Sequence, residues 1–204
     1  MPNFDDDEYE SFDLDRAAGD PAKAPAAEDE PDEPDELDDE DEDEIEDATD
    51  EEIDFVIAAY REDGQLYVQS LANDLANDLE ELIVQLRRLP GDAGALGFVS
   101  LVEELFVLVR VRGQHVQVLL SDGGATEDWP IAHDVADLLG DDAEDEDEPL
   151  GDLGIVADLG LGEFDMGAIL DNLDLSSDQM LIEIAEKINL NPQFRKTVEA
   201  AFSG

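Results

Sequence analysis

The stretch IDFVIAAYREDGQLYVQSL, from Ile53 to Leu71, predicts a β-hairpin. Two runs rich in β-branched and aromatic residues flank the dipeptide Asp63-Gly64. An Asp-Gly pair in this position favours a type I′ turn, which needs a positive φ at both central residues. The chain therefore begins its folded part with two antiparallel strands.

The next stretch, from Asn73 to Gly91, predicts an amphipathic helix. Leucine and isoleucine recur at three- and four-residue steps and define one apolar face. These residues are Leu75, Leu79, Leu82, Ile83, Leu86 and Leu89. Asn73 or Asp74 can cap the start, Arg87 and Arg88 suit the negative end, and Pro90 stops the helix.

Three more strands and a second helix complete this region. The strands are expected over residues 95–102, 104–112 and 115–121, and the helix over 129–140, with Pro130 in its first turn and Gly140 at its end. The order β-β-α-β-β-β-α over residues 53–140 predicts an α+β domain with an antiparallel five-stranded sheet. This order resembles the profilin-like folds, in particular the longin and Roadblock type.

Charge divides the 204-residue chain into further segments. Residues 1–52 hold 27 acidic and two basic side chains, which predicts a disordered acidic tail. Residues 141–152 hold eight acidic and no basic side chains, which predicts a linker. Residues 153–204 are expected to form a small helical C-terminal unit, in which Ser176 to Gln179 fits a capping box. These helices are expected to pack on the sheet, on each other or on a partner.

Composition excludes several functions. The net charge of −49 repels nucleic acid, so direct nucleic-acid binding is not expected, and it favours basic protein partners. The sequence has no cysteine, which rules out disulfides and thiolate metal sites. It has no signal peptide and no long apolar run, so a cytoplasmic protein without a membrane span is expected. Neither a cofactor nor a metal is expected.

No pattern of catalytic residues stands out. The sequence lacks G-x-S-x-G, a P-loop and H-E-x-x-H. The two histidines, His115 in a predicted strand and His133 in a predicted helix, have no evident catalytic partner. We therefore expect that the chain is not an enzyme.

Several segments carry a resemblance to a known family. AAYREDG (residues 58–64), LRRLPG (86–91), FVLVRVRG (106–113) and the pair LLSD and DWP (119–122 and 128–130) resemble the bacterial tRNA adenosine deaminase-associated protein family. The resemblance covers residues 57–140 well and the C-terminal helices more loosely. It implies a link to tRNA adenosine deaminase by partnership, because zinc deaminases need a histidine, a glutamate and a P-C-x-x-C pair that this chain lacks.

Three residues stand out as interface candidates. Arg110 and Arg112 are two positions apart on a predicted strand and so point to the same face. They either form ion pairs with nearby carboxylates or offer a docking spot to an anionic segment. Trp129 lies at a loop-to-helix junction, where a tryptophan is either a core residue or an interface anchor.

Two functions remain open at this point. One is a non-catalytic binding or regulatory partner of the tRNA-specific adenosine deaminase or of another basic protein. The alternative is a general protein-interaction scaffold unrelated to tRNA editing. An enzyme of unrecognised mechanism ranks third.

Overall fold

The computed structural model describes residues 45–91, 93–140 and 148–203. The predicted hairpin is confirmed: β1 (Ile53–Glu62) and β2 (Gln65–Ser70) pair antiparallel, and the turn residues Asp63 and Gly64 have φ values of 52° and 77°. These positive values are the ones that a type I′ turn requires.

The sheet is antiparallel, as predicted, but it has six strands and not five. The remaining strands are β3 (Ala95–Leu101), β4 (Leu105–Arg112), β5 (His115–Leu120) and β6 (Leu150–Gly151), in the spatial order β2-β1-β3-β4-β5-β6. The sixth strand comes from the stretch predicted as a linker. Leu150 and Gly151 pair with Leu120 and Leu119, and two residues are too few to show a strand periodicity in the sequence.

One face of the sheet is covered by α1 (Leu79–Arg88) and α2 (Pro130–Leu139). The helix α1 is shorter than predicted. Residues Asn73–Ala76 form a separate 3₁₀ turn, and Asp78, not Asn73 or Asp74, caps α1 by accepting a hydrogen bond from the Glu81 N–H at 2.7 Å. The helix α2 ends at Gly140, whose φ of 64° fits the left-handed C-terminal position.

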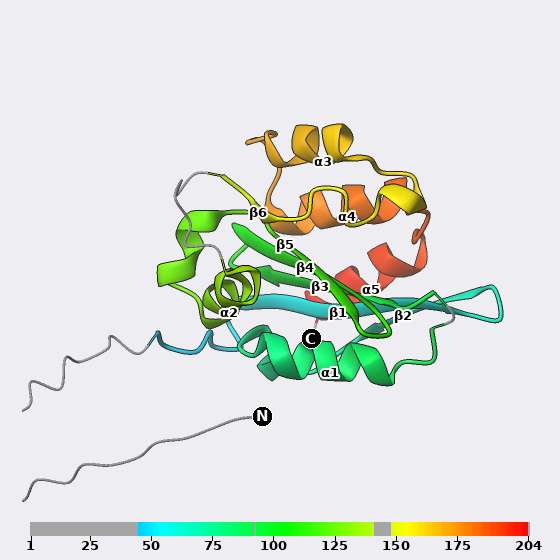
Figure 1. Cartoon of the computed structure of the whole chain (residues 1–204), viewed down its shortest axis with the longest axis horizontal. Coiled ribbons are helices and arrows are strands. Elements are labelled where there is room, and N and C mark those ends of the chain that lie inside the picture. Colours follow the sequence, from blue (N-terminus) through cyan, green and yellow to red (C-terminus); the bar gives the residue numbers. More distant parts are fainter. Residues whose placement is uncertain (1–44, 92, 141–147, 204) are drawn as a thin grey trace, which may run out of the picture. The chain divides into compact units, whose positions relative to one another are not determined.

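The opposite face is covered by the C-terminal helices α4 (Ser177–Lys187) and α5 (Gln193–Ala201), and α3 (Glu163–Leu170) packs on α4. Figure 1 shows α4 and α1 on opposite sides of the strands. The aromatic ring of Phe194 from α5 lies against Phe98 at 4.7 Å and Phe55 at 6.2 Å between centroids. The helices thus pack on the sheet and on each other, which are two of the three arrangements that the sequence allowed.

Polar contacts add to this second interface. The Ser100 hydroxyl lies 2.8 Å from Asp54 and 2.7 Å from the hydroxyl of Ser177, at the start of α4. The predicted capping box is not formed. Ser176 stands at the N-cap, but its hydroxyl donates to the Asp178 carboxylate instead of accepting a bond from the helix backbone.

The described structure begins within the predicted tail. Ala48 is only 7% exposed and belongs to the core on the α1 side of the sheet. Its backbone N–H and C=O both bond to the side chain of Asn77, at 2.8 and 3.0 Å. Residues 1–44 of the predicted tail and 141–147 of the predicted linker lie outside the described residues.

Candidate functional site

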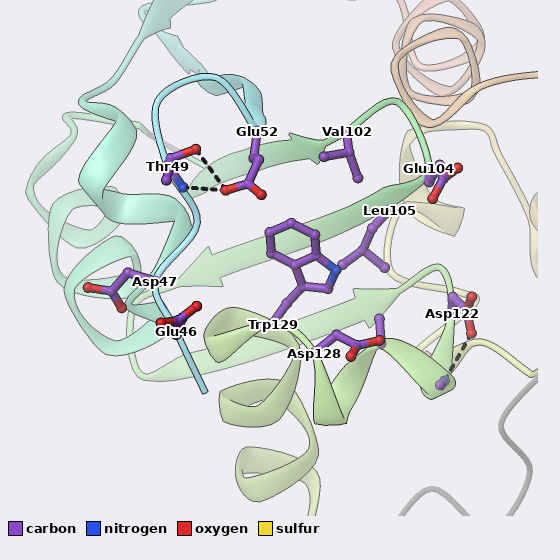
Figure 2. Close-up of a pocket in the computed structure, with 12 residues that line it drawn as sticks. Glu46, Asp47, Thr49, Glu52, Val102, Glu104, Leu105, Asp122, Asp128 and Trp129 are labelled. Carbon is purple, nitrogen blue, oxygen red and sulfur yellow. Dashed lines mark hydrogen bonds between the residues drawn. The ribbon is translucent and has the colours of Figure 1, made fainter. Parts of the chain in front are cut away.

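A cleft of about 770 Å³ opens at the end of the sheet where β3 turns into β4. Three segments that are distant in sequence form its walls: residues 46–52, residues 102–105 and residues 122–129. Figure 2 shows the indole of Trp129 at the centre of these residues. The cleft has room for a side chain or a small ligand to enter.

Local hydrogen bonds hold Trp129 in position. Asp122 caps the 3₁₀ helix Gly123–Glu127 by accepting from the Gly124 N–H at 2.9 Å. The Trp129 N–H then donates to the Ala125 carbonyl at 3.0 Å. Trp129 itself occupies the N-cap of α2, and Pro130 follows it. The side chain is therefore carried by two short helices packed on each other, not by a free loop.

The segment before β1 forms the second wall. The Glu52 carboxylate accepts hydrogen bonds from the backbone N–H of Thr49 at 2.8 Å and from its hydroxyl at 2.7 Å. These two bonds, the backbone one first, hold the pKa of Glu52 below its ordinary value. The carboxylate accordingly stays ionised at neutral pH.

The β3–β4 turn forms the third wall and has an unusual backbone. Val102 and Glu103 have φ values of 47° and 57°, in the left-handed region that non-glycine residues rarely occupy. The Val102 N–H donates to the Glu52 carbonyl at 2.8 Å, and the Glu103 N–H donates to the Asp54 carboxylate at 2.8 Å. The neighbouring segments thus hold the turn in this conformation.

Every charged residue that lines the cleft is acidic. These residues are Glu46, Asp47, Glu52, Glu104, Asp122 and Asp128. Among the described residues, no group of three or more potential ligands is placed to hold a metal ion. A half-buried tryptophan among carboxylates instead suits an organic cation, because the face of an indole attracts ammonium and guanidinium groups.

Of the three predicted interface residues, Trp129 lies in this cleft and the two arginines lie elsewhere. The Arg110 side chain is 5% exposed, and its guanidinium makes a two-pronged contact with Asp158. It also donates to the Ile155 carbonyl at 2.7 Å. Arg110 therefore fastens the chain after β6 to the sheet.

Arg112 remains partly accessible. Its side chain is 41% exposed, lies 3.9 Å from Asp158 and donates to Gln117 at 2.9 Å. Both arginines thus form the ion pairs that the first interpretation expected. The hydrogen bonds from Arg110 are the main reason why the pKa of Asp158 lies below its ordinary value.

Sequence reasoning missed the acidic wall of the cleft. Glu46, Asp47 and Glu52 lie in the stretch predicted as a tail, where they are indistinguishable by composition from their acidic neighbours. One local signal was present. Thr49 and Glu52 have the Thr-x-x-Glu spacing that is typical of reciprocal bonds at a chain turn, and Ile53 begins the first strand directly after it.

No solved structure matches the chain, so the likeness to profilin-like folds stays a prediction. Within the described residues, none of the helices combines the length and the apolar character that a bilayer crossing requires. Protein Rv3753c of Mycobacterium tuberculosis is 32% identical over 158 residues, which cover 74% of this chain and 91% of that protein.

A family model gives the same result. The model described as Rv3753c-like tRNA adenosine deaminase-associated protein matches residues 54–191, which include all the long strands and the helices up to the end of α4. The match extends well beyond the segments on which the sequence resemblance rested. The chain therefore belongs to the Rv3753c-like tRNA adenosine deaminase-associated protein family.

Proposed function

We propose that this chain is a non-catalytic binding protein that associates with a tRNA-specific adenosine deaminase. The observation that carries the proposal is the cleft of Trp129, in which every charged residue around the aromatic ring is acidic. The family description supports this choice of partner. A catalytic role is not supported, because the sequence lacks the cysteines of a deaminase zinc site.

The acidic cleft is complementary in charge to the basic surface with which an enzyme binds tRNA. An enzyme that acts on tRNA must present lysine and arginine side chains to phosphates. One such side chain entering the cleft would stack on Trp129 and meet ionised carboxylates on the surrounding walls. Binding of this kind would occupy part of the tRNA surface, so we expect the chain and tRNA to compete for the deaminase.

The single tryptophan gives a direct measurement. Trp129 is the only tryptophan of the chain, so the difference between its fluorescence in the free and mixed proteins reports on the cleft. Titration with a deaminase whose tryptophans have been replaced by phenylalanine should change this fluorescence, and raising the salt concentration should weaken the binding. Added tRNA should reverse the change.

Variants test whether the cleft carries the contact. Replacing Trp129 by Leu should weaken binding about thirtyfold, as expected for a central interface anchor, when measured by calorimetry. Asp128→Asn should reduce the affinity and its salt dependence. Asp63→Asn is the matched control, because Asp63 is also exposed but lies in the β1–β2 turn, at the opposite end of the sheet from the β3–β4 turn.

Two results would overturn the proposal. One is the absence of binding to the deaminase at micromolar concentration and low salt. The other is binding that the Trp129 and Asp128 variants leave unchanged while their circular dichroism shows an intact fold. Capture of a different basic protein through the same cleft would favour the scaffold alternative.

A further inference from the structure

The strand β2 forms one edge of the six-stranded sheet. The Leu71 N–H donates to the Val56 carbonyl at 2.8 Å, which fixes the alternation of bonds along the β1–β2 pair. Residues 65, 67 and 69 therefore direct their backbone groups towards β1. Leu66, Val68 and Ser70 direct theirs outwards, where the described part of the chain places no further strand.

This edge lacks the devices that usually prevent strands from pairing with other chains. Natural edge strands are protected by charged residues, proline, bulges or short length. No charged residue and no proline occurs from Gly64 to Asn73, and the register between β1 and β2 is regular over six pairs. The opposite edge differs, because β6 has only two residues.

Side chains on both faces of the edge strand also make packing contacts. The side chains of Leu66 and Val68 pack against the core beneath the C-terminal helices. On the other face, the ring of Tyr67 stacks on that of Tyr60, with centroids 5.3 Å apart and planes at 14°. An incoming strand would therefore meet backbone groups already held in an extended conformation, which reduces the entropy lost on pairing.

Charge identifies the occupant. A basic strand would find no carboxylate on β2 with which to form an ion pair. Two copies of this chain each carry a net charge of −49, so they can approach closely only where acidic residues are absent, as they are on β2. Antiparallel pairing of β2 with its own copy opposes uncharged residues throughout. With Val68 on the two-fold axis, Leu66 faces Ser70 and Tyr67 faces Gln69 of the second copy.

We infer that this chain forms a homodimer by pairing β2 with β2, which joins the two sheets into one. The pairing is isologous, as a two-fold axis requires, and each outward N–H and C=O meets a partner. The inference is independent of the proposed function. The two also respond oppositely to salt, because screening weakens binding to a basic protein but reduces the repulsion between two acidic copies.

Sedimentation of the full chain over a range of concentrations tests the inference. We expect a monomer–dimer equilibrium that shifts towards the dimer as the salt concentration rises. Val68→Pro removes the central outward N–H from both copies and should raise the dimer dissociation constant about thirtyfold. Val68→Ala is the matched control, since it loses side-chain packing but keeps the N–H.

A second variant keeps the test decisive if Val68→Pro does not fold. Tyr67→Glu introduces a carboxylate into the charge-free edge and should weaken the dimer, whereas Tyr67→Gln should not. Both substitutions lose the same ring stack, on the exposed side of the strand. A chain that stays monomeric at all concentrations and salt levels, or a dimer that withstands both Val68→Pro and Tyr67→Glu, would overturn the inference.

The absence of native cysteine allows the register to be measured. A mixture of Tyr67→Cys and Gln69→Cys chains should form a disulfide between copies under mild oxidation, because the two positions are opposite each other when Val68 lies on the axis. Each single-cysteine chain alone should cross-link much less. Equal cross-linking in all three samples would contradict this pairing.

Discussion

On one face of the sheet, α1 and α2 lie close in sequence to the strands that they cover, whereas the other face is covered by a segment that follows all the long strands. The first face is closed by amphipathic helices whose apolar spacing is visible in the sequence. The second face is closed by α4 and α5, whose apolar residues also recur at helical spacing, whereas α3, packed on α4, has almost no separation of polar and apolar sides.

Polar contacts hold the layer on the second face in position. Across the second interface, Arg110 holds the chain after β6 and Ser100 contacts Ser177 at the start of α4. Arg61 adds a bond to the Asn189 carbonyl at 3.3 Å. Directional bonds of this kind fix the position of a layer that apolar contact alone would leave free to slide.

Removal of the C-terminal layer should have the largest effect on the molecule. A chain that ends at Gly140 would expose the second apolar face of the sheet. The residues concerned include Phe55, Ile57, Phe98, Phe106, Leu108 and Leu119. We expect this chain to aggregate or to bind a hydrophobic dye, and to lose its cooperative thermal transition. A chain of residues 45–204 is the control and should unfold cooperatively.

A single side chain should produce the next largest effect. Phe194 is fully buried against Phe55 and Phe98, so Phe194→Ala should lower the free energy of unfolding by about 4 kcal/mol. The measurement is urea denaturation followed by circular dichroism. Phe202→Ala removes a ring of the same size that is 50% exposed, and it should cost clearly less. A loss for Phe194→Ala no larger than that for Phe202→Ala would contradict the role of Phe194 as the main anchor of α5.

The Arg110–Asp158 pair should contribute less. Asp158→Asn should lower the free energy of unfolding at pH 7 by about 2 kcal/mol, because a buried guanidinium loses its charged partner while Asp158 itself is half exposed. Arg112→Gln is the control and should change it by less than about 1 kcal/mol, as is usual for exposed pairs.

The pH dependence of this pair has a definite sign. The folded pKa of Asp158 is lowered, so its contribution is complete above the unfolded value of about 4 and is lost as the pH falls through the folded value. The difference in stability between the natural chain and Asp158→Asn should therefore shrink below about pH 4. A constant difference down to pH 2 would show that the charge of Asp158 is not responsible.

Local signals in the sequence explain what could be predicted of the fold. The turn at Asp63-Gly64 and the end of α2 at Gly140 depend on the backbone preferences of single residues, so both are visible without a structure. The predicted start of α1 was wrong because Asn73, Asp74 and Asp78 are all acceptable N-cap residues. The choice between them depends on the 3₁₀ turn over residues 73–76, which packs on the core.

Long-range contacts explain what could not be predicted. The sequence shows that Arg110 and Arg112 share a face, but the carboxylate that both contact lies more than forty residues away. Trp129 is visible as an anchor candidate, yet the acidic walls beside it come from segments that only the sheet brings together. Composition describes each segment separately and contains no information on which of them meet.

The β3–β4 turn connects the cleft with the C-terminal helices. Val102 lines the cleft, while the Glu103 carbonyl accepts a bond from the Ser177 N–H at 2.9 Å, at the start of α4. Adjacent residues in the left-handed region cannot adjust independently, since a change in one alters the direction of the next. A ligand that moved Val102 would thus change the docking free energy of the C-terminal layer. Thermodynamic linkage makes the effect reciprocal, so loosening α4 would change the affinity of the cleft by the same factor.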